Sequence, residues 1–128
     1  MVDQIAAVRA AIDRRISRGI SNFVIDLVHR LTATDGSGTP RDTGWAAANW
    51  TATIGAARVG TIGTRAAAEQ GNVSFGAQRL GLAQLATGYK LEQGDVHVTN
   101  NVPYIALLNA VNNPMFVERA IAQAIQKF

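Results

Sequence analysis

The stretch DQIAAVRAAIDRRISRGISNFVIDLVHRLT, residues 3–32, decides the expected fold. Its large apolar residues recur every three or four positions, with an average step of about 3.7, which is the period of an α-helix. They are Ile5, Val8, Ile12, Ile16, Ile20, Phe23, Leu27 and Leu31. Asp3 is a suitable N-cap. The stretch predicts a helix of about 45 Å, whose apolar stripe packs along the domain or projects toward a partner.

The remainder of the chain predicts a small α+β body at residues 45–128, after a Gly- and Pro-containing loop at residues 34–44. Alternating apolar and polar residues predict strands at 50–54, 58–64 and 95–99. Helical spacing predicts further helices over 74–89, from Pro103 as the first helical position, and after Asn113 as the cap with Pro114 in the first turn. Tyr104, Leu107, Leu108 and Val111 would share one face of the helix that begins at Pro103. We therefore expect a single α+β domain, residues 1–128, with a long N-terminal helix, a small antiparallel sheet, and helices packed on it that include a C-terminal amphipathic helix.

Composition excludes several classes of protein. The chain has 128 residues, of which 48% are hydrophobic and 16% charged, so it is neither disordered throughout nor built around a membrane span. It has no cysteine, which excludes a disulfide scaffold, thiol catalysis and cysteine-ligated zinc. The N-terminus lacks the basic and apolar segments of a secretory signal, so we expect synthesis in the cytoplasm and no membrane partner.

The positive charge is small and spread out. Twelve Lys and Arg residues against nine Asp and Glu give a net charge of +3, without the basic and aromatic cluster typical of nucleic-acid binders. Four arginines could form a basic stripe on the first helix: Arg9, Arg14, Arg15 and Arg18. This stripe suits phosphate contact, but Asp3, Asp13 and Asp26 dilute it. A solvated helix face or salt bridges between subunits is the favoured interpretation.

The sequence contains no recognisable catalytic or metal-binding motif. Its two histidines, His29 and His97, have no neighbouring acid or histidine at metal-ligand spacing. No serine lies in a nucleophile elbow, and Gly36-Ser37-Gly38 lacks the Gly-Lys-Ser/Thr ending of a phosphate-binding loop. We expect neither an enzyme nor a cofactor.

Two stretches stand out by their residue types. The first is TPRDTG, residues 39–44, which runs into Trp45 and then into the Asn49–Trp50 pair. Within it, proline fixes φ, Asp and Thr can accept hydrogen bonds from nearby backbone N–H groups, and Gly44 permits a tight turn. The second is VTNNVPY, residues 98–104, a junction between strand and helix. Either stretch alone could be ordinary turn chemistry.

Together and in this order, the two stretches resemble the tail-completion (neck or minor tail) proteins of tailed bacteriophages. Such proteins typically combine a long N-terminal helix, a Thr-Pro-x-Asp-Thr-Gly loop, a small-residue run that ends in Asn/Ser-Trp, and a strand followed by Pro-Tyr-Ala and a leucine helix. The matching positions are Thr39, Pro40, Asp42, Thr43, Gly44, Asn49, Trp50, Val96, Val98, Asn100, Pro103, Tyr104, Phe116, Val117 and Ile121. The family's acidic pair after the Pro-Tyr helix is missing here, because Leu108-Asn109-Ala110 runs directly toward Asn113–Pro114.

The resemblance implies a structural virion protein without catalytic activity. It implies a homo-oligomeric ring at the head-proximal end of the tail, six-fold by preference and twelve-fold as the alternative near the portal. The expected neighbours are other neck, tail-terminator or tail-tube proteins, in a virion assembled in the bacterial host cytoplasm. The Pro40–Gly44 loop and the Asn100–Tyr104 junction would either shape the domain or contact other subunits.

Two questions stay open at this point. Trp50 is expected in the core, whereas Trp45 is the better candidate for a large anchor at an interface. The main rival function is a module that contacts packaged DNA in the neck channel, which would bind duplex with a steep salt dependence. A small hydrolase or sugar-binding module is a more distant alternative, because it needs convergent polar residues in a pocket.

Overall fold

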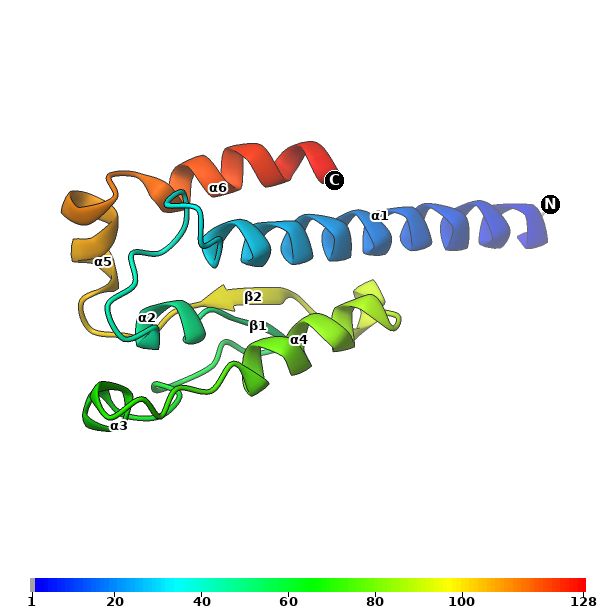
Figure 1. The fold of residues 1–128 in the computed structure, drawn as a ribbon. Coiled ribbons are helices and arrows are strands. Elements are labelled where there is room, and N and C mark those ends of the chain that lie inside the picture. The colour runs from blue at the N-terminus through cyan, green and yellow to red at the C-terminus, as the bar shows by residue number, and fades with distance from the viewer. Residues whose placement is uncertain (1) are drawn as a thin grey trace.

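The computed structural model describes residues 2–128 and confirms the α+β architecture. The first helix, α1, spans Val2–Leu31, as the apolar spacing predicted. It runs through most of the molecule, with the C-terminal helix on one side and the sheet and α4 (Gly76–Ala86) on the other, and stops short of the end formed by α5 (Figure 1). The long helix is therefore the central layer of the fold.

The sheet has two antiparallel strands, β1 (Thr51–Ile54) and β2 (Val96–Thr99), both of which the alternation predicted. Thr51 pairs with Thr99, and their hydroxyls lie 3.4 Å apart. Helix α4 covers β1 at close range, since a Cβ at Gly81 would lie 2.4 Å from the carbonyl oxygen of Ala52. The absence of a side chain at Gly81 thus sets the distance between helix and strand.

The C-terminal helix α6 (Phe116–Ala124) and the 3-10 turn η3 (Ile125–Lys127) lie along α1. Small residues on α6 allow the close approach. The core between these two helices consists of Leu27, Leu31, Trp50, Phe116, Ala120 and Ala124. A second core lies between α1, the sheet and α4, and consists of Val24, Val28, Ala52, Leu85 and Tyr89.

Short elements connect these layers. They are α2 (Trp45–Ala48), α3 (Arg65–Glu69), the 3-10 turn η1 (Leu91–Gln93), α5 (Ile105–Leu107) and the π-helical turn η2 (Leu108–Asn112). A third core lies at α2 and consists of Trp45, Ala46, Ala68 and Val102. Helix α5 lies at the opposite end of the molecule from the start of α1 (Figure 1).

Three local predictions are wrong. Residues 58–64 form no strand, because Gly60 and Gly63 adopt left-handed φ values of 81° and 69°. Asn113–Pro114 is not the start of a helix: α6 begins at Phe116, after Met115 at a φ of 60°. Pro103 precedes its helix by two residues and lies in a turn.

The side chain of Asn113 bonds to other segments of the chain. Its Nδ2 donates to the carbonyls of Gly36 and Gly38 at 3.1 and 2.9 Å, which ties the loop after α1 to the segment before α6. Its Oδ1 accepts a hydrogen bond from Arg119 at 2.7 Å. Asn113 therefore holds two segments together instead of capping a helix.

Candidate assembly surfaces

The loop before α2 is anchored by Thr39. Its hydroxyl donates to the carbonyl of Leu31 at 2.6 Å and accepts the indole N–H of Trp50 at 2.7 Å. Its backbone N–H donates to the same carbonyl at 2.8 Å. Since Thr39 and Trp50 are both buried, this part of the first motif holds the end of α1 against the start of β1.

Asn49 holds the small-residue run against the irregular segment that follows β1. Its Nδ2 donates to the carbonyl of Trp45 at 2.8 Å, and its Oδ1 accepts the N–H of Ile62 at 2.6 Å. The indole of Trp45 donates to the carbonyl of Ile62 at 2.9 Å. Gly44 begins α2 with a φ of 86°, the left-handed turn that its position suggested.

The structure brings the two motif stretches together. Asn100 Nδ2 donates to the carbonyl of Ala46 at 2.8 Å, and its Oδ1 accepts the N–H of Val102 at 3.1 Å. The rings of Trp45 and Tyr104 lie 6.0 Å apart. A pocket of about 200 Å³ between the stretches is lined by residues 40–46, Tyr104, Leu108 and Asn112. The motifs therefore meet at one small surface, although more than fifty residues separate them in the chain.

The two tryptophans are both core residues. Trp50 is 7% exposed, as expected, and Trp45 is 6% exposed. The expectation that Trp45 offers a surface for contact is wrong, because Ala68 of α3 and Val102 pack against it within the same chain. Of the remaining motif residues, Asp42 and Pro103 are exposed, while Pro40, Thr43, Gly44, Asn100 and Tyr104 are half-buried. Thr43 Oγ1 accepts the N–H of Trp45 at 3.3 Å.

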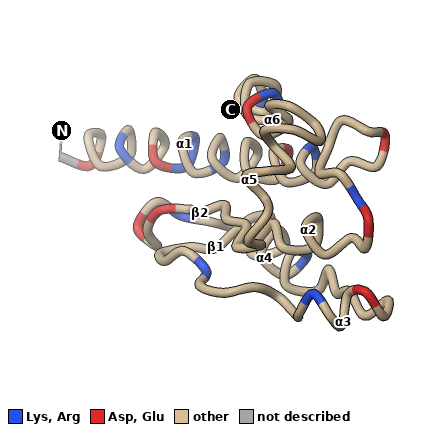
Figure 2. Tube along the Cα trace, turned by 90° about the vertical axis from the view of Figure 1, so that its left-hand side faces the viewer, with Lys and Arg blue, Asp and Glu red and all other residues tan. Residues whose placement is uncertain are grey.

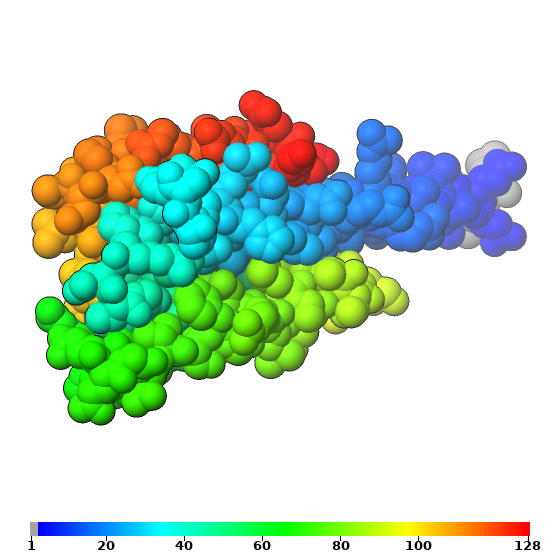
Figure 3. Space-filling model, in the orientation of Figure 1, coloured from blue at the N-terminus to red at the C-terminus, as the bar shows by residue number. Residues whose placement is uncertain are grey.

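The most conspicuous surface is the N-terminal part of α1, which projects from the body (Figure 3). Residues 3–15 are exposed on every side, over about 20 Å of helix. Ile5, Val8 and Ile12 are each between 52 and 58% exposed and lie on one face at steps of three and four. We call these three residues the α1 stripe. Soluble proteins expose single apolar side chains routinely, but an aligned row on a projecting rod is typical of a contact surface.

The α1 stripe continues the face of α1 that α6 covers nearer the body. Phe23 and Leu27 on that face belong to or pack against the α1–α6 core. The covering layer ends where the ring of Phe128 lies over Gly19, at which an added Cβ would be 3.1 Å from a ring carbon. Beyond this point no segment among residues 2–128 covers the stripe.

The segment that forms the opposite end of the molecule contains no charged residue. No Lys, Arg, Asp or Glu occurs between Asp95 and Glu118, and the tube of α5 itself is tan in Figure 2. Leu107, Val111 and Met115 are each between 57 and 64% exposed there. We call these three residues the α5–η2 patch. Helical spacing placed Leu107 and Val111 on a common face with Leu108, but only Leu108 packs against the core.

The four arginines of the predicted basic stripe lie toward the exposed N-terminal part of α1, together with Asp3 and Asp13 (Figure 2). The segment of residues 2–18 thus carries four positive and two negative side chains, a net charge of +2. The ion pairs found within residues 2–128, Asp26–Arg30 and Arg65–Glu69, include none of these arginines. Arg9 and Arg15 flank the α1 stripe by helical position, whereas Arg14 and Arg18 lie on the side of α1 that faces η1.

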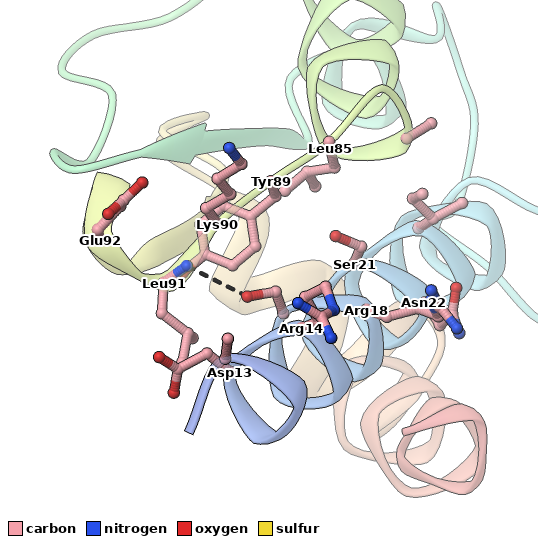
Figure 4. Close-up of a pocket in the computed structure, with 15 residues that line it drawn as sticks. Asp13, Arg14, Arg18, Ser21, Asn22, Leu85, Tyr89, Lys90, Leu91 and Glu92 are labelled. Carbon is pink, nitrogen blue, oxygen red and sulfur yellow. Dashed lines mark hydrogen bonds between the residues drawn. The ribbon is translucent and has the colours of Figure 1, made fainter. Parts of the chain in front are cut away.

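A cleft of about 670 Å³ opens between α1, the end of α4 and η1 (Figure 4). The N–H of Leu91 donates to Ser17 Oγ at 3.2 Å, which holds η1 against α1. The charged lining residues are Asp13, Arg14, Arg18, Lys90 and Glu92. All five are exposed and of both signs, so the cleft has no single polarity that would select a ligand, and we assign it no function.

Residues 2–128 show neither a metal site nor a membrane-spanning helix. Within residues 2–128, no group of three or more His, Asp or Glu side chains is placed to hold a metal ion. In the same residues, no helix combines the length and apolar character needed to cross a bilayer. Comparisons of the chain with protein-family models, with curated proteins and with solved structures give no match.

Proposed function

We propose that this chain is a structural subunit of a tailed bacteriophage virion that acts in tail completion and head–tail joining at the neck. It assembles as a ring of identical copies, six-fold by preference and twelve-fold as the alternative next to the portal. Its neighbours are other neck, tail-terminator or tail-tube proteins, and it performs no reaction. The sequence supports this proposal through the two motif stretches, and the geometry supports it through the surfaces that the fold leaves bare.

The observation that carries the proposal is the projecting α1 stripe. Ile5, Val8 and Ile12 are more than half exposed on a helix that extends beyond its own covering layers. Each square ångström of apolar surface removed from water contributes about 25 cal/mol. A helix of this length gains stability from tertiary packing more than from intrinsic propensity, so its free end is best explained by a partner that covers it.

The motif residues then have a structural role in the subunit. Thr39, Trp50, Asn49 and Asn100 connect the loop, the sheet and the irregular segment through hydrogen bonds that are buried (Trp50–Thr39) or half-buried (Asn49–Ile62 and Asn100–Ala46). A frame of this kind fixes the position of α1 relative to the α5–η2 end. In a ring, this fixed geometry sets the angle between neighbouring copies, because each copy repeats the same contact.

DNA contact in the neck channel is a second candidate, and the exposed arginines of α1 favour it. Arg9, Arg14, Arg15 and Arg18 lie on a rod that could reach packaged DNA. Each phosphate contact releases counterions, so binding would weaken by orders of magnitude between about 50 and 200 mM salt. Absence of duplex binding at about 50 mM salt would remove this candidate.

The test of the proposed function is the location and mass of the native protein. Particles purified from the cells that encode the chain should contain it in several copies per particle, as measured by quantitative mass spectrometry. The purified chain should form a closed oligomer by native mass measurement. Absence from assembled particles, or a monomer at every concentration, would contradict the proposal.

A further inference from the structure

We infer that the α1 stripe of one copy docks on the α5–η2 patch of the next, so that copies join head to tail. This inference rests on the proposed function, because it specifies the contact from which the ring is built. The donor is the face of α1 that carries Ile5, Val8 and Ile12, and the acceptor is the exposed group Leu107, Val111 and Met115 at the other end of the molecule.

The two surfaces lie at opposite ends of the same subunit (Figure 1). One contact, repeated from copy to copy, therefore covers both surfaces. A contact between unlike patches is heterologous and closes into a ring when the rotation allows. A two-fold contact between like patches would leave one of the two surfaces bare in every copy.

Charge also favours the unlike pairing. Two α1 segments placed side by side would bring together two net charges of +2, and an antiparallel pair centred near Val8 would place Arg9 beside Arg9 of the other copy. The α5–η2 patch carries no charged side chain of its own. Glu118 and Arg119, which bond to Asn109 and Asn113 beside it, have opposite signs, so the patch receives the segment without net like-charge repulsion. Arg9 and Arg15, which flank the stripe, then remain at the solvated rim.

The docked copy would continue a layer that already exists within the subunit. Helix α6 and η3 cover one face of α1 as far as Gly19, where Phe128 lies against the helix. The α1 stripe is the uncovered remainder of that face. A helical turn of a second copy placed beyond Phe128 would cover it, as α6 covers Phe23 and Leu27.

Single charges placed in each surface test the inference. Val8→Asp damages the donor only, and Val111→Asp damages the acceptor only. Both positions are exposed in the subunit, so the fold should persist, and the far-ultraviolet circular dichroism spectrum checks this. Burying an unpaired carboxylate should raise the half-assembly concentration more than tenfold in either variant. Val59→Asp is the matched control, because Val59 is 95% exposed on the irregular segment and belongs to neither surface.

Mixing the two variants gives the sharper result. The intact donor of Val111→Asp can dock on the intact acceptor of Val8→Asp, but neither remaining surface can extend the chain. An equimolar mixture should therefore yield a heterodimer and no larger species by native mass spectrometry, whereas each variant alone stays monomeric. Ile5→Asp and Leu107→Asp repeat the design at second positions.

The outcomes separate this inference from the function on which it rests. If Val8→Asp and Val111→Asp both form rings of the same mass as the wild-type protein, the inference is overturned and the proposed function stays intact. Self-association of Val111→Asp alone indicates pairing of like stripes and overturns it as well. Loss of particle incorporation with an unchanged oligomer means that the stripe contacts a different virion protein, which again overturns it. A wild-type chain that is monomeric at all concentrations overturns both proposals.

Discussion

Trp50 donates its indole N–H to the hydroxyl of Thr39 at 2.7 Å, and that hydroxyl donates in turn to the carbonyl of Leu31 at 2.6 Å. Three segments meet in this chain of bonds: the end of α1, the loop after it and the residue before β1. All three residues are buried. A hydroxyl at position 39 is therefore required as donor and acceptor at once.

Replacing this hydroxyl should destabilise the folded chain. Thr39→Val keeps the shape but leaves the buried indole N–H of Trp50 without an acceptor, which costs about 1–3 kcal/mol. Urea unfolding followed by tryptophan fluorescence measures the change. Thr34→Val, at an exposed position of the same loop, should leave stability within about 0.5 kcal/mol of wild type. Equal stability of the two variants would contradict the role of the Thr39 bond.

The close contact between α4 and β1 predicts that alanine substitutions at two glycines of α4 change the stability of the protein differently. An alanine Cβ at Gly81 would lie 2.4 Å from the backbone oxygen of Ala52, so Gly81→Ala must push the helix away. We expect a loss of about 1–3 kcal/mol, as for other overpacked sites. At Gly76 the nearest atom is the side-chain oxygen of Ser74 at 3.3 Å, so Gly76→Ala should be neutral or slightly stabilising. Thermal unfolding of both variants makes the comparison, and similar melting temperatures would argue against the close approach.

Gln78 makes the corresponding polar contact beneath α4. Its Nε2 donates to the carbonyls of Ala47 and Trp50 at 2.9 and 3.0 Å, in a buried position. Gln78→Leu removes the donor for both carbonyls and should cost about 1–3 kcal/mol. Gln84→Leu, on the exposed side of the same helix, is the control and should change stability by less than about 0.5 kcal/mol. Chemical denaturation measures the free energy of unfolding of both variants. Equal values would show that the Gln78 hydrogen bonds do not contribute to stability.

Much of the fold follows from local patterns in the sequence. The step of three and four along α1, and the alternation at Thr51–Ile54 and Val96–Thr99, predict the central helix and both strands. Periodicity succeeds here because the large apolar side chains of each element pack into the cores on either side of α1. It fails at residues 58–64, where left-handed glycines and a hydrogen bond from the Asn101 side chain to the carbonyl of Arg58 favour an irregular path.

The exposed apolar surfaces are harder to predict from the sequence than the fold is. The sequence indicates an apolar stripe along α1, but only the fold shows where α6 ends and the stripe becomes bare at Ile12. Trp45 was expected at the surface because nothing in a Trp-Ala-Ala-Ala run indicates its distant partners. Its burial depends on Ala68 and Val102, which come from elements far along the chain. The uncharged interval between Asp95 and Glu118 was a sequence signal that could have located the α5–η2 patch.

The loop after α1 contains a carboxyl group, that of Asp35, whose pKa should make stability depend on pH. The hydroxyl and the backbone N–H of Ser37 both donate to Asp35 and hold the pKa of its carboxyl below the ordinary value of 3.8. A pKa lowered by folding stabilises the folded state above pH 3.8, and this contribution is lost as the pH falls through the folded-state pKa. Ser37→Ala removes the side-chain bond, which is the larger cause, so the pKa of Asp35 should rise toward its ordinary value. Ser37→Thr keeps a hydroxyl and should retain the lowered pKa. A carbon-detected NMR titration of the Asp35 carboxyl measures all three proteins, and an unchanged pKa in Ser37→Ala would show that the backbone bond alone is responsible.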